Sequence, residues 1–301
     1  MSDVKLGVIG LGSMGLGMAR NAIAAGIATK GYDIFPAARE AFAAAGGTPA
    51  ASVAETAADV DVLIVMVVNA AQVRDAVFGP DGAAAAMRPG AVVMVCSTIA
   101  PKDAREIGRD LAEAGLLVID TPVSGGKVGA EAGTLTLMAS GPEAAFDLAA
   151  PVIAAVSQTV YRLGDEPGMG STYKVVHQLA AGVHLAVAAE VMAFAAHAGC
   201  DTGVLADIVS KSAGRSWMFT DRVPHMLDDD FAPRSTVDIF VKDLGLVIET
   251  GHASKTPLPL AAAAHQLFLA ASSMGHGQID DSAVVKVYES ATGSPVKRRE
   301  N

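Results

Sequence analysis

Residues 5–33 read KLGVIGLGSMGLGMARNAIAAGIATKGYD, and this stretch decides the fold. A short apolar segment ending at Ile9 has the composition of a buried strand, and it runs directly into the glycine-rich turn 10–15. A segment without proline follows to Gly26 and is compatible with a helix, and a second strand then ends at Asp33. The stretch therefore predicts a strand, a glycine turn, a helix and a second strand, which is how a parallel α/β sheet begins.

The glycine spacing in that turn is the G-x-G-x-x-G pattern of dinucleotide-binding folds. Gly10 is expected to permit the tight turn, Gly12 to let the backbone approach a pyrophosphate, and Gly15 to let the helix pack closely on the strand. The N–H groups at the helix start are expected to face the anion. A glycine turn in some other α/β protein is the alternative, and the strand before and helix after the turn disfavour it. The predicted cofactor contacts are Gly10, Leu11, Gly12, Ser13, Met14 and Gly15.

Asp33 predicts which nicotinamide cofactor is used. A carboxylate at the end of the second strand can accept hydrogen bonds from the ribose hydroxyls, whereas it would repel a 2′-phosphate. The sequence therefore favours NAD over NADP. Arg39 lies six residues further on, and we interpret it as a solvated helix residue rather than a phosphate ligand.

Composition bounds the class of protein. The chain of 301 residues is long enough for two domains with their own cores. Its longest fully apolar run, near residues 62–68, is far shorter than the roughly 20 residues of a membrane span, and no secretory signal precedes the first strand. We therefore expect a cytoplasmic protein without a membrane partner. The net charge of −10 argues against nucleic acid, and two cysteines provide neither a disulfide framework nor a CxxC pair.

Strand and helix patterns alternate as far as Gly164, as expected for a doubly wound parallel sheet. The further strands are expected at 62–67, 91–95, 116–119, 134–138 and 159–161, and the helices at 36–45, 52–58, 70–78, from 101, and at 142–156. Ligands in such sheets lie beyond the carboxyl ends of the strands. Asn69, Ser97, Thr98 and the loop Ser124-Gly125-Gly126 follow strands and are expected on the cofactor side.

After Gly164 the pattern becomes entirely helical. Residues 168–198 contain no proline and no strand pattern, so they can form one long helix shared between domains. Shorter helices are expected at 201–212, 219–227, 239–252, 257–274 and 282–290. We predict a Rossmann NAD-binding domain over residues 1–164 and an all-α substrate and oligomerisation domain over residues 165–301. Because a single small domain could hardly cover the long helix, a homodimer or homotetramer is expected through this second half.

Lys174 is the residue in the second half that could carry out chemistry. Its spacing to Gln178 puts both side chains on one helix face. An ammonium near a helix N-terminus is electrostatically unfavourable, which suits a group that acts as an acid–base in its neutral form. The alternative is a surface lysine that extends from an amphipathic helix, and position alone favours that alternative. No histidine pair near this helix has the spacing of a helical metal site, so no metal is predicted.

Four motifs together resemble the β-hydroxyacid dehydrogenase family. They are the glycine turn 10–15, Asp120-Thr-Pro-Val-Ser-Gly-Gly126, Gly168-x-Gly-x-x-x-Lys174 and Lys242-Asp243-Leu244. The resemblance covers nearly the whole chain. It implies a nicotinamide-dependent dehydrogenase in which Lys174 is the catalytic acid–base.

The same resemblance implies roles for the remaining site residues. Ser124, Gly125 and Gly126 would bind the carboxylate of a small hydroxy acid substrate. Thr98 and Lys242 would contact the cofactor, Asp243 would lie at the cleft between domains, and Asn69 would occupy the loop position that faces the cofactor.

Gln178 departs from the common family pattern, which has asparagine four residues after the lysine. The longer amide disfavours the usual substrate 3-hydroxyisobutyrate. Residues 170–178, GSTYKVVHQ, most resemble the branch that oxidises four-carbon sugar acids, which implies oxidation of L-threonate to its 2-oxo acid. Reduction of tartronate semialdehyde and oxidation of 3-hydroxyisobutyrate remain alternatives within the family. A scaffold that binds NAD without catalysis is the alternative outside it.

Overall fold

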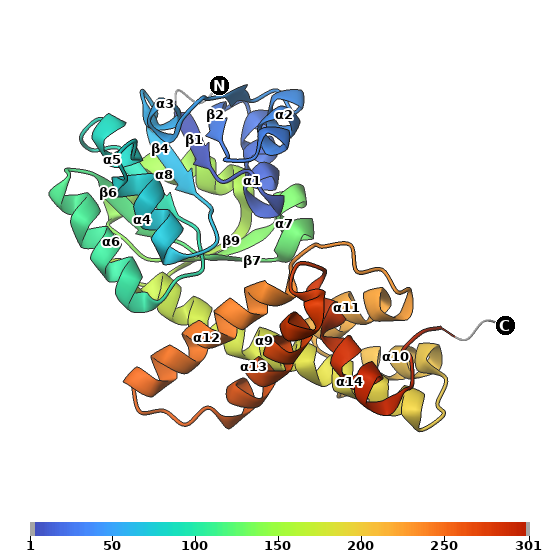
Figure 1. The fold of residues 1–301 in the computed structure, drawn as a ribbon. Helices are drawn as coiled ribbons and strands as arrows, with labels where there is room; N and C mark the ends of the chain where they lie inside the picture. Colours follow the sequence, from blue (N-terminus) through green and yellow to red (C-terminus); the bar gives the residue numbers. More distant parts are fainter. Residues whose placement is uncertain (1–3, 299–301) are drawn as a thin grey trace. The chain divides into compact units, whose positions relative to one another are not determined.

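The fold, seen in Figure 1, is that of a computed structural model that describes residues 4–298. It divides into one unit that reaches to Val175 and a second that begins at Val176. The first unit contains a parallel sheet with helices on both faces, and the second unit contains helices without a strand in its described residues. The predicted fold class is therefore confirmed.

The main sheet has six strands in the order β3-β2-β1-β4-β5-β6, and every pair is parallel. Its strands are β1 (Lys5–Ile9), β2 (Ala28–Tyr32), β3 (Thr48–Pro49), β4 (Val62–Val65), β5 (Val92–Val95) and β6 (Leu117–Asp120). From β1 the chain adds β2 and β3 on one side of that strand. It then crosses over and adds β4, β5 and β6 on the other side of β1. The topological switch point therefore lies between β1 and β4, where such sheets bind ligands beyond the carboxyl ends of the strands.

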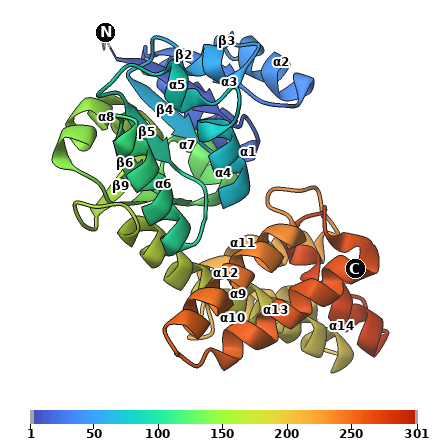
Figure 2. The same ribbon diagram turned by 60° about the vertical axis from the view of Figure 1, so that its left-hand side comes forward.

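Two layers of helices bury the sheet. On one face lie α1 (Ser13–Ala24), α2 (Pro36–Ala44) and α8 (Glu143–Val156). On the other face lie α3 (Val53–Ala57), α4 (Ala70–Phe78), α5 (Ala83–Ala86) and α6 (Pro101–Glu113), of which α4 and α6 are prominent in Figure 2. Every residue of β4 is fully buried, as its continuous apolar run predicted.

A separate three-stranded sheet follows β6. It contains β7 (Val123–Ser124), β8 (Leu135–Ala139) and β9 (Ser157–Arg162), with α7 (Gly126–Ala132) between the first two. The strands β8 and β9 were predicted, whereas β7 and α7 were not, because two residues carry no pattern and glycine disfavours helix. Tertiary contact overrides that preference, since a side chain on Gly17 of α1 would lie only 2.7 Å from the backbone of Ala130 in α7.

The long helix α9 (Met169–His197) begins in the first unit, on a buried carboxylate. Asp120, at the end of β6, is 1% exposed. It accepts hydrogen bonds from the N–H groups of Gly168 and Ser171, both at 2.8 Å, and from the Ser171 hydroxyl at 2.6 Å. A side chain on Gly170 would lie 2.4 Å from two backbone oxygens, so only glycine fits there. Asp120 therefore caps α9 and fixes its start against the sheet.

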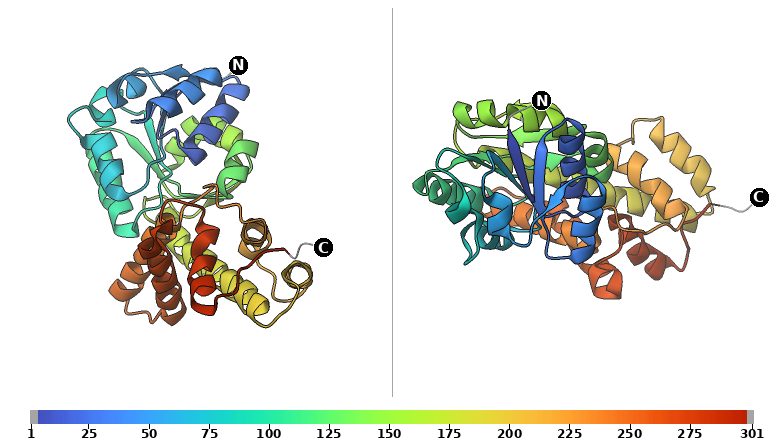
Figure 3. Two further views of the ribbon diagram at one scale, coloured as in Figure 1. Left: turned by 45° about the vertical axis from the view of Figure 1, so that its right-hand side comes forward. Right: turned by 90° about the horizontal axis from the view of Figure 1, so that it is seen from above.

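The second unit gathers shorter helices around the rest of α9 (Figure 3). They are α10 (Thr202–Ser210), α11 (Trp217–Leu227), α12 (Val237–Ala253), α13 (Pro259–Ala271), η1 (Ser272–His276), η2 (Asp281–Val284) and α14 (Val285–Thr292). Asp201 caps α10 by accepting the Val204 N–H at 2.9 Å. The helix predicted over residues 257–274 corresponds to α13 followed by the π-helical turn η1, in which Gly275, at φ +91°, leaves the helical conformation directly after the predicted end.

By length and composition, α9 is the one helix among residues 4–298 that could cross a membrane, with a mean hydropathy of 1.8 in its most apolar window. Half of that window is buried within the protein, as in the core helix of a globular domain.

Candidate active site

The glycine turn has the geometry that its spacing predicted. Gly10 has φ +89°, and a side chain there would lie 2.2 Å from the Met66 carbonyl oxygen. A side chain on Gly15 would lie 1.8 Å from the Gly10 carbonyl oxygen, so the helix can approach the turn only without one. Gly12 faces open space, with no atom within 4 Å of the position that its side chain would take. Gly10 and Gly15 thus make the turn tight, and Gly12 leaves one side of it open, which fits a dinucleotide.

Asp33 holds this turn from the end of β2. Its Oδ2 accepts the Leu11 N–H at 2.7 Å and its Oδ1 accepts the Phe35 N–H at 2.9 Å. The Leu11 N–H is therefore already bonded, and the Leu11 side chain is only 2% exposed in the core. Leu11 precedes the helix, so this bond does not use any of the N–H groups that are expected to face the anion. The N–H groups of the first turn of α1, from Ser13 onward, have no acceptor within the helix and stay available for one.

Arg39 also differs from its interpretation as a solvated helix residue. Its guanidinium donates to the Asp33 backbone carbonyl at 2.5 Å and lies over the Tyr32 ring, 5.6 Å from the ring centre. The cation is therefore held beside the end of β2.

Of the residues that follow β4 and β5, Asn69 and Ser97 hydrogen-bond to nearby backbone, and Thr98 is half-buried. The Asn69 side chain accepts the Gln72 N–H at 2.9 Å and caps α4. Ser97 is fully buried and accepts the Val67 N–H at 3.0 Å, so it joins two loops and is not exposed to a ligand. Ser97 lies beyond the carboxyl end of β5, which is the predicted cofactor side of the sheet, and its hydroxyl bonds the loop after β4. Thr98 is half-buried at the carboxyl end of β5.

The loop Ser124-Gly125-Gly126 joins β7 to α7. Gly125 has φ +125° and Gly126 has φ +60°, conformations that other residues rarely adopt. A side chain on Gly126 would meet nothing within 4 Å, so its glycine serves the backbone conformation and leaves the surrounding space open. The half-buried Ser124 lies at the end of β7, next to these two glycines.

Lys174 is only 6% exposed, one turn after the Asp120 cap of α9. The alternative of a surface lysine extending into solvent is therefore wrong. A lysine side chain that could extend into solvent is costly to bury, and buried ionisable groups are frequent at functional sites, which favours a functional lysine here.

Gln178, one helical turn further along α9, belongs to a buried polar network in the second unit. Its Nε2 donates to Asp243 Oδ2 at 2.5 Å, and its Oε1 lies 3.0 Å from Nδ1 of His177. Lys242 Nζ lies 2.7 Å from Asp243 Oδ1. That last contact is a charge pair without the alignment of a hydrogen bond, because Oδ1 has no hydrogen-bond partner among the described residues. The ammonium compensates the buried negative charge of Asp243, which is 2% exposed.

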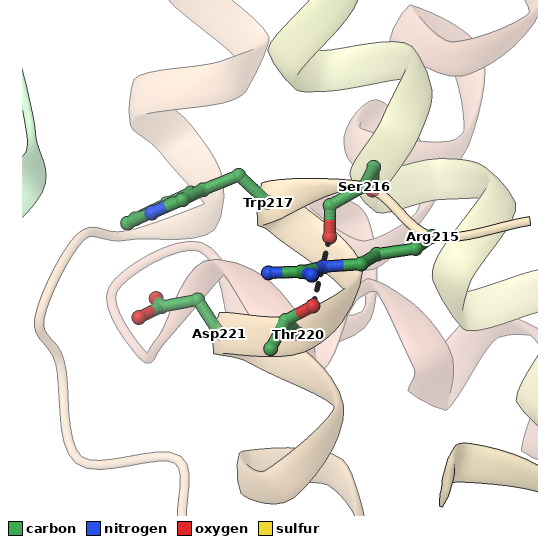
Figure 4. A pocket seen from close by; sticks show the side chains of 5 residues that line it. All are labelled: Arg215, Ser216, Trp217, Thr220 and Asp221. Carbon is green, nitrogen blue, oxygen red and sulfur yellow. Dashed lines mark hydrogen bonds between the residues drawn. The ribbon is translucent and has the colours of Figure 1, made fainter. Parts of the chain in front are cut away.

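Two features of the second unit were missed in the sequence. His177 contacts Gln178, although neighbouring positions on a helix normally point apart. Figure 4 shows a pocket lined by Arg215, Ser216, Trp217, Thr220 and Asp221. Trp217 is 57% exposed there, so it is not a core residue of the helical domain. The signal that could have indicated this pocket is arginine and tryptophan flanking the Ser216 cap of α11.

Neither the Cys96 thiol nor the metal-binding types of side chain form a further candidate site among the described residues. Burial raises the pKa of the Cys96 thiol, with a further contribution from Asp120, so Cys96 stays a neutral core residue. Among residues 4–298, no group of three His, Cys, Asp or Glu side chains is arranged to hold a metal ion.

Comparisons with known proteins agree with this architecture. Residues 5–164 match the NAD binding domain of 6-phosphogluconate dehydrogenase, and residues 168–288 match the domain described as NAD-binding of NADP-dependent 3-hydroxyisobutyrate dehydrogenase. L-threonate dehydrogenase of Cupriavidus necator is 52% identical over 94% of this chain and 96% of its own length. L-threonate dehydrogenase of Escherichia coli K12 is 50% identical over 97% of each chain.

A solved structure is equally similar. The crystal structure described as 3-hydroxyisobutyrate dehydrogenase from Salmonella typhimurium is 52% identical, with a TM-score of 0.91, over 95% of this chain and 100% of that one. The Rossmann sheet, the open glycine turn and the buried lysine define a nicotinamide-dependent oxidoreductase with a helical second unit. The chain belongs to the β-hydroxyacid dehydrogenase family, and it is an NAD-dependent hydroxy acid dehydrogenase.

Gly15 is tightly packed and Gly12 is not, so we expect substitution of Gly15 to lower stability and substitution of Gly12 to weaken cofactor binding. Gly15→Ala places a methyl group against the Gly10 carbonyl and should lower the free energy of unfolding by about 3 kcal/mol or more. Gly12→Ala has room for its methyl group and should keep wild-type stability, but it should bind NADH at least tenfold more weakly. Thermal unfolding and fluorescence titration with NADH measure both. Wild-type NADH affinity in Gly12→Ala would show that the dinucleotide does not pass over this residue.

Proposed function

We propose that this dehydrogenase oxidises L-threonate to its 2-oxo acid with NAD. The buried Lys174, followed one turn later by an oriented Gln178, is the observation that carries the proposal. Relatives about half identical to this chain are described as L-threonate dehydrogenases, whereas an equally similar structure is described as 3-hydroxyisobutyrate dehydrogenase. Oxidation of 3-hydroxyisobutyrate and reduction of tartronate semialdehyde are therefore the alternatives to be tested.

The proposed mechanism assigns one task to each group. Ser124, Gly125 and Gly126 bind the substrate carboxylate, which their open backbone conformation supports. Lys174, neutral when it acts, removes the proton from the reacting hydroxyl, and in the reverse direction it returns that proton. Gln178 orients the substrate through its amide. The glycine turn and Asp33 would hold NAD, which would supply the acceptor for the hydride that leaves the substrate carbon.

The cofactor contacts are proposed on the edge of the sheet where β1, β4 and β5 end. The turn from Gly10 to Gly15 receives the pyrophosphate, and Asp33 receives the ribose hydroxyls. Both oxygens of Asp33 already accept one N–H each, and a carboxylate has room for about four such bonds, so its backbone bonds leave capacity for the ribose. Asn69, Thr98 and Lys242 complete the proposed contacts, while Asp243 acts behind Gln178 on the substrate side.

We also propose a functional division at Gly164, with an NAD-binding domain over 1–164 and a substrate and oligomerisation domain over 165–301. The two family domains matched, 5–164 and 168–288, support this division. The compact units divide later, at Val175, because Asp120 fixes the first turns of α9 to the first unit. We place the protein in the cytoplasm, where NAD and small hydroxy acids are available.

We propose a homodimer or homotetramer that assembles through the second unit. Val176, Val187 and Phe194 of α9 are 66%, 49% and 71% exposed, and their spacing puts them on one stripe of the helix. An exposed apolar stripe of this length is typical of an interface between subunits.

Substitution of that stripe tests the assembly. Light scattering should report a particle at least twice the 30.5 kDa of one chain, and Phe194→Glu should shift it toward the monomer because a carboxylate is costly in an apolar interface. Ala196→Glu, at a half-buried position about 200° away around the helix and so outside the stripe, is the control for added charge. A monomeric wild-type protein would contradict the proposal.

The substrate is tested with NADH formation at 340 nm on L-threonate, D-threonate, D-erythronate, D-glycerate and 3-hydroxyisobutyrate. We expect the highest kcat/KM for L-threonate, and a preference for NAD over NADP because Asp33 repels a 2′-phosphate. Turnover of D-glycerate or 3-hydroxyisobutyrate without L-threonate would keep the family and reject the proposed substrate.

The proton-transfer role is tested with Lys174→Ala. Positioned proton transfer contributes about 10² to 10⁴ in rate, so kcat should fall by at least about 100-fold while NADH affinity stays unchanged. Lys211→Ala, a surface lysine paired with Asp207, should retain full activity. Near-normal turnover in Lys174→Ala would exclude lysine as the acid–base.

A further inference from the structure

The orientation of the Gln178 amide is determined by its two neighbours. A carboxylate only accepts hydrogen bonds, so the amide atom 2.5 Å from Asp243 must be the nitrogen. The amide oxygen then faces His177, and an oxygen only accepts, so Nδ1 of His177 must carry its proton. A flipped amide would place its oxygen against the carboxylate and its N–H groups against the Nδ1 proton, and both contacts are repulsive.

The chain of contacts begins at a fixed charge. Lys242 pairs with Asp243, Asp243 accepts from Gln178, and Gln178 accepts from His177. Gln178 and Asp243 are 6% and 2% exposed, so both side chains are largely shielded from bulk water. In such a network each member restricts the orientation of the next.

The network leaves part of the amide for a ligand. A glutamine amide has two N–H donors and two acceptor positions on its oxygen, and the two contacts use one of each. One N–H and one acceptor position remain on the same planar group. Two adjacent hydroxyls of a ligand satisfy both, one accepting and the other donating, each with a straight hydrogen bond. A single hydroxyl can also donate and accept, but it reaches both amide groups only through bent, weaker hydrogen bonds, so a ligand with one hydroxyl satisfies the amide less well.

We infer that His177 is a positioning residue that sets the specificity of this enzyme for acids with vicinal hydroxyls. This inference rests on the proposed function of Gln178 as the group that orients the substrate. His177 acts through Gln178. Its Nδ1–H fixes the amide, so that the remaining N–H of Gln178 always meets one hydroxyl of the diol and the amide oxygen always meets the other. L-threonate and D-glycerate carry vicinal hydroxyls, whereas 3-hydroxyisobutyrate carries one hydroxyl and a methyl group.

Kinetics of three variants test the inference. In His177→Ala the amide loses one of its two constraints, so the ratio of kcat/KM for L-threonate to that for 3-hydroxyisobutyrate should fall about tenfold, the effect of one hydrogen bond. NADH affinity and melting temperature should not change. His177→Asn supplies an amide N–H in place of Nδ1–H and should recover most of the ratio. His252→Ala, an exposed histidine on the helix that carries Asp243, is the matched control.

Three outcomes would overturn the inference. The first is a ratio in His177→Ala within twofold of the wild-type value. The second is an equal loss on both substrates with a lower melting temperature, which indicates a purely structural histidine. The third comes from a long-range ¹H–¹⁵N spectrum of histidine-labelled protein, in which His177, assigned by its loss in His177→Ala, must show the Nδ1–H tautomer. The Nε2–H tautomer would reverse the amide and contradict the network.

Failure of the proposed function gives a different result. If the wild-type protein does not oxidise L-threonate, that substrate is wrong, and the ratio is then taken between D-glycerate and 3-hydroxyisobutyrate. The expected tenfold loss in His177→Ala is the same, because D-glycerate also presents adjacent hydroxyls. The tautomer of His177 needs no substrate and tests the network in either case.

Discussion

The buried carboxylate of Asp120 is the constraint on which the rest of the site depends. It ends strand β6, and it accepts two N–H groups and a hydroxyl from the first turn of α9. Burial raises the pKa of this carboxyl, and the hydrogen bonds from Ser171 and Gly168 oppose that rise by stabilising its charged form at the positive end of the helix dipole. Because β7 and the Ser124 loop follow four residues later, one anchor sets both the proposed carboxylate-binding loop and the start of the helix that carries Lys174.

That anchor also changes the electrostatic argument about the lysine. The helix dipole alone makes an ammonium near the helix N-terminus unfavourable and predicts a lysine that acts in its neutral form. The carboxyl of Asp120 lies at the same helix end and accepts the Ser171 N–H, so the electrostatics of this end depend on Asp120 as well as on the helix. The burial of Lys174 remains the stronger reason for a functional role, because a side chain that could extend into solvent is instead 6% exposed.

Much of the fold could be predicted because the hydrophobic pattern and the positions of proline and glycine agree with the tertiary structure. The apolar run at 62–67 and the proline at 101 specify a buried strand and a helix start without knowledge of any neighbour. Helix α7 could not be predicted, because it is held by Gly17 and Asn21 of α1, which contact Ala130 from more than 100 residues away in sequence. In the site, too, one part follows from the local sequence and another part does not. Glycine spacing predicted the turn, but the bond from Leu11 to Asp33 and the contact of His177 with Gln178 depend on side-chain placement, which no local pattern encodes.

The proposed acid–base and the substrate-orienting amide are linked through a single rigid element. Lys174 and Gln178 are four residues apart on α9, which corresponds to about 6 Å along a helix axis whatever the arrangement of the two units. Lys174 is fixed from the first unit through the Asp120 anchor, and Gln178 is fixed from the second through Asp243. A change in the position of either unit therefore cannot separate the group that moves the proton from the group that orients the hydroxyls. In the proposed site, the longer amide at position 178 would select the substrate without changing that separation, because the amide is held by its contacts with His177 and Asp243.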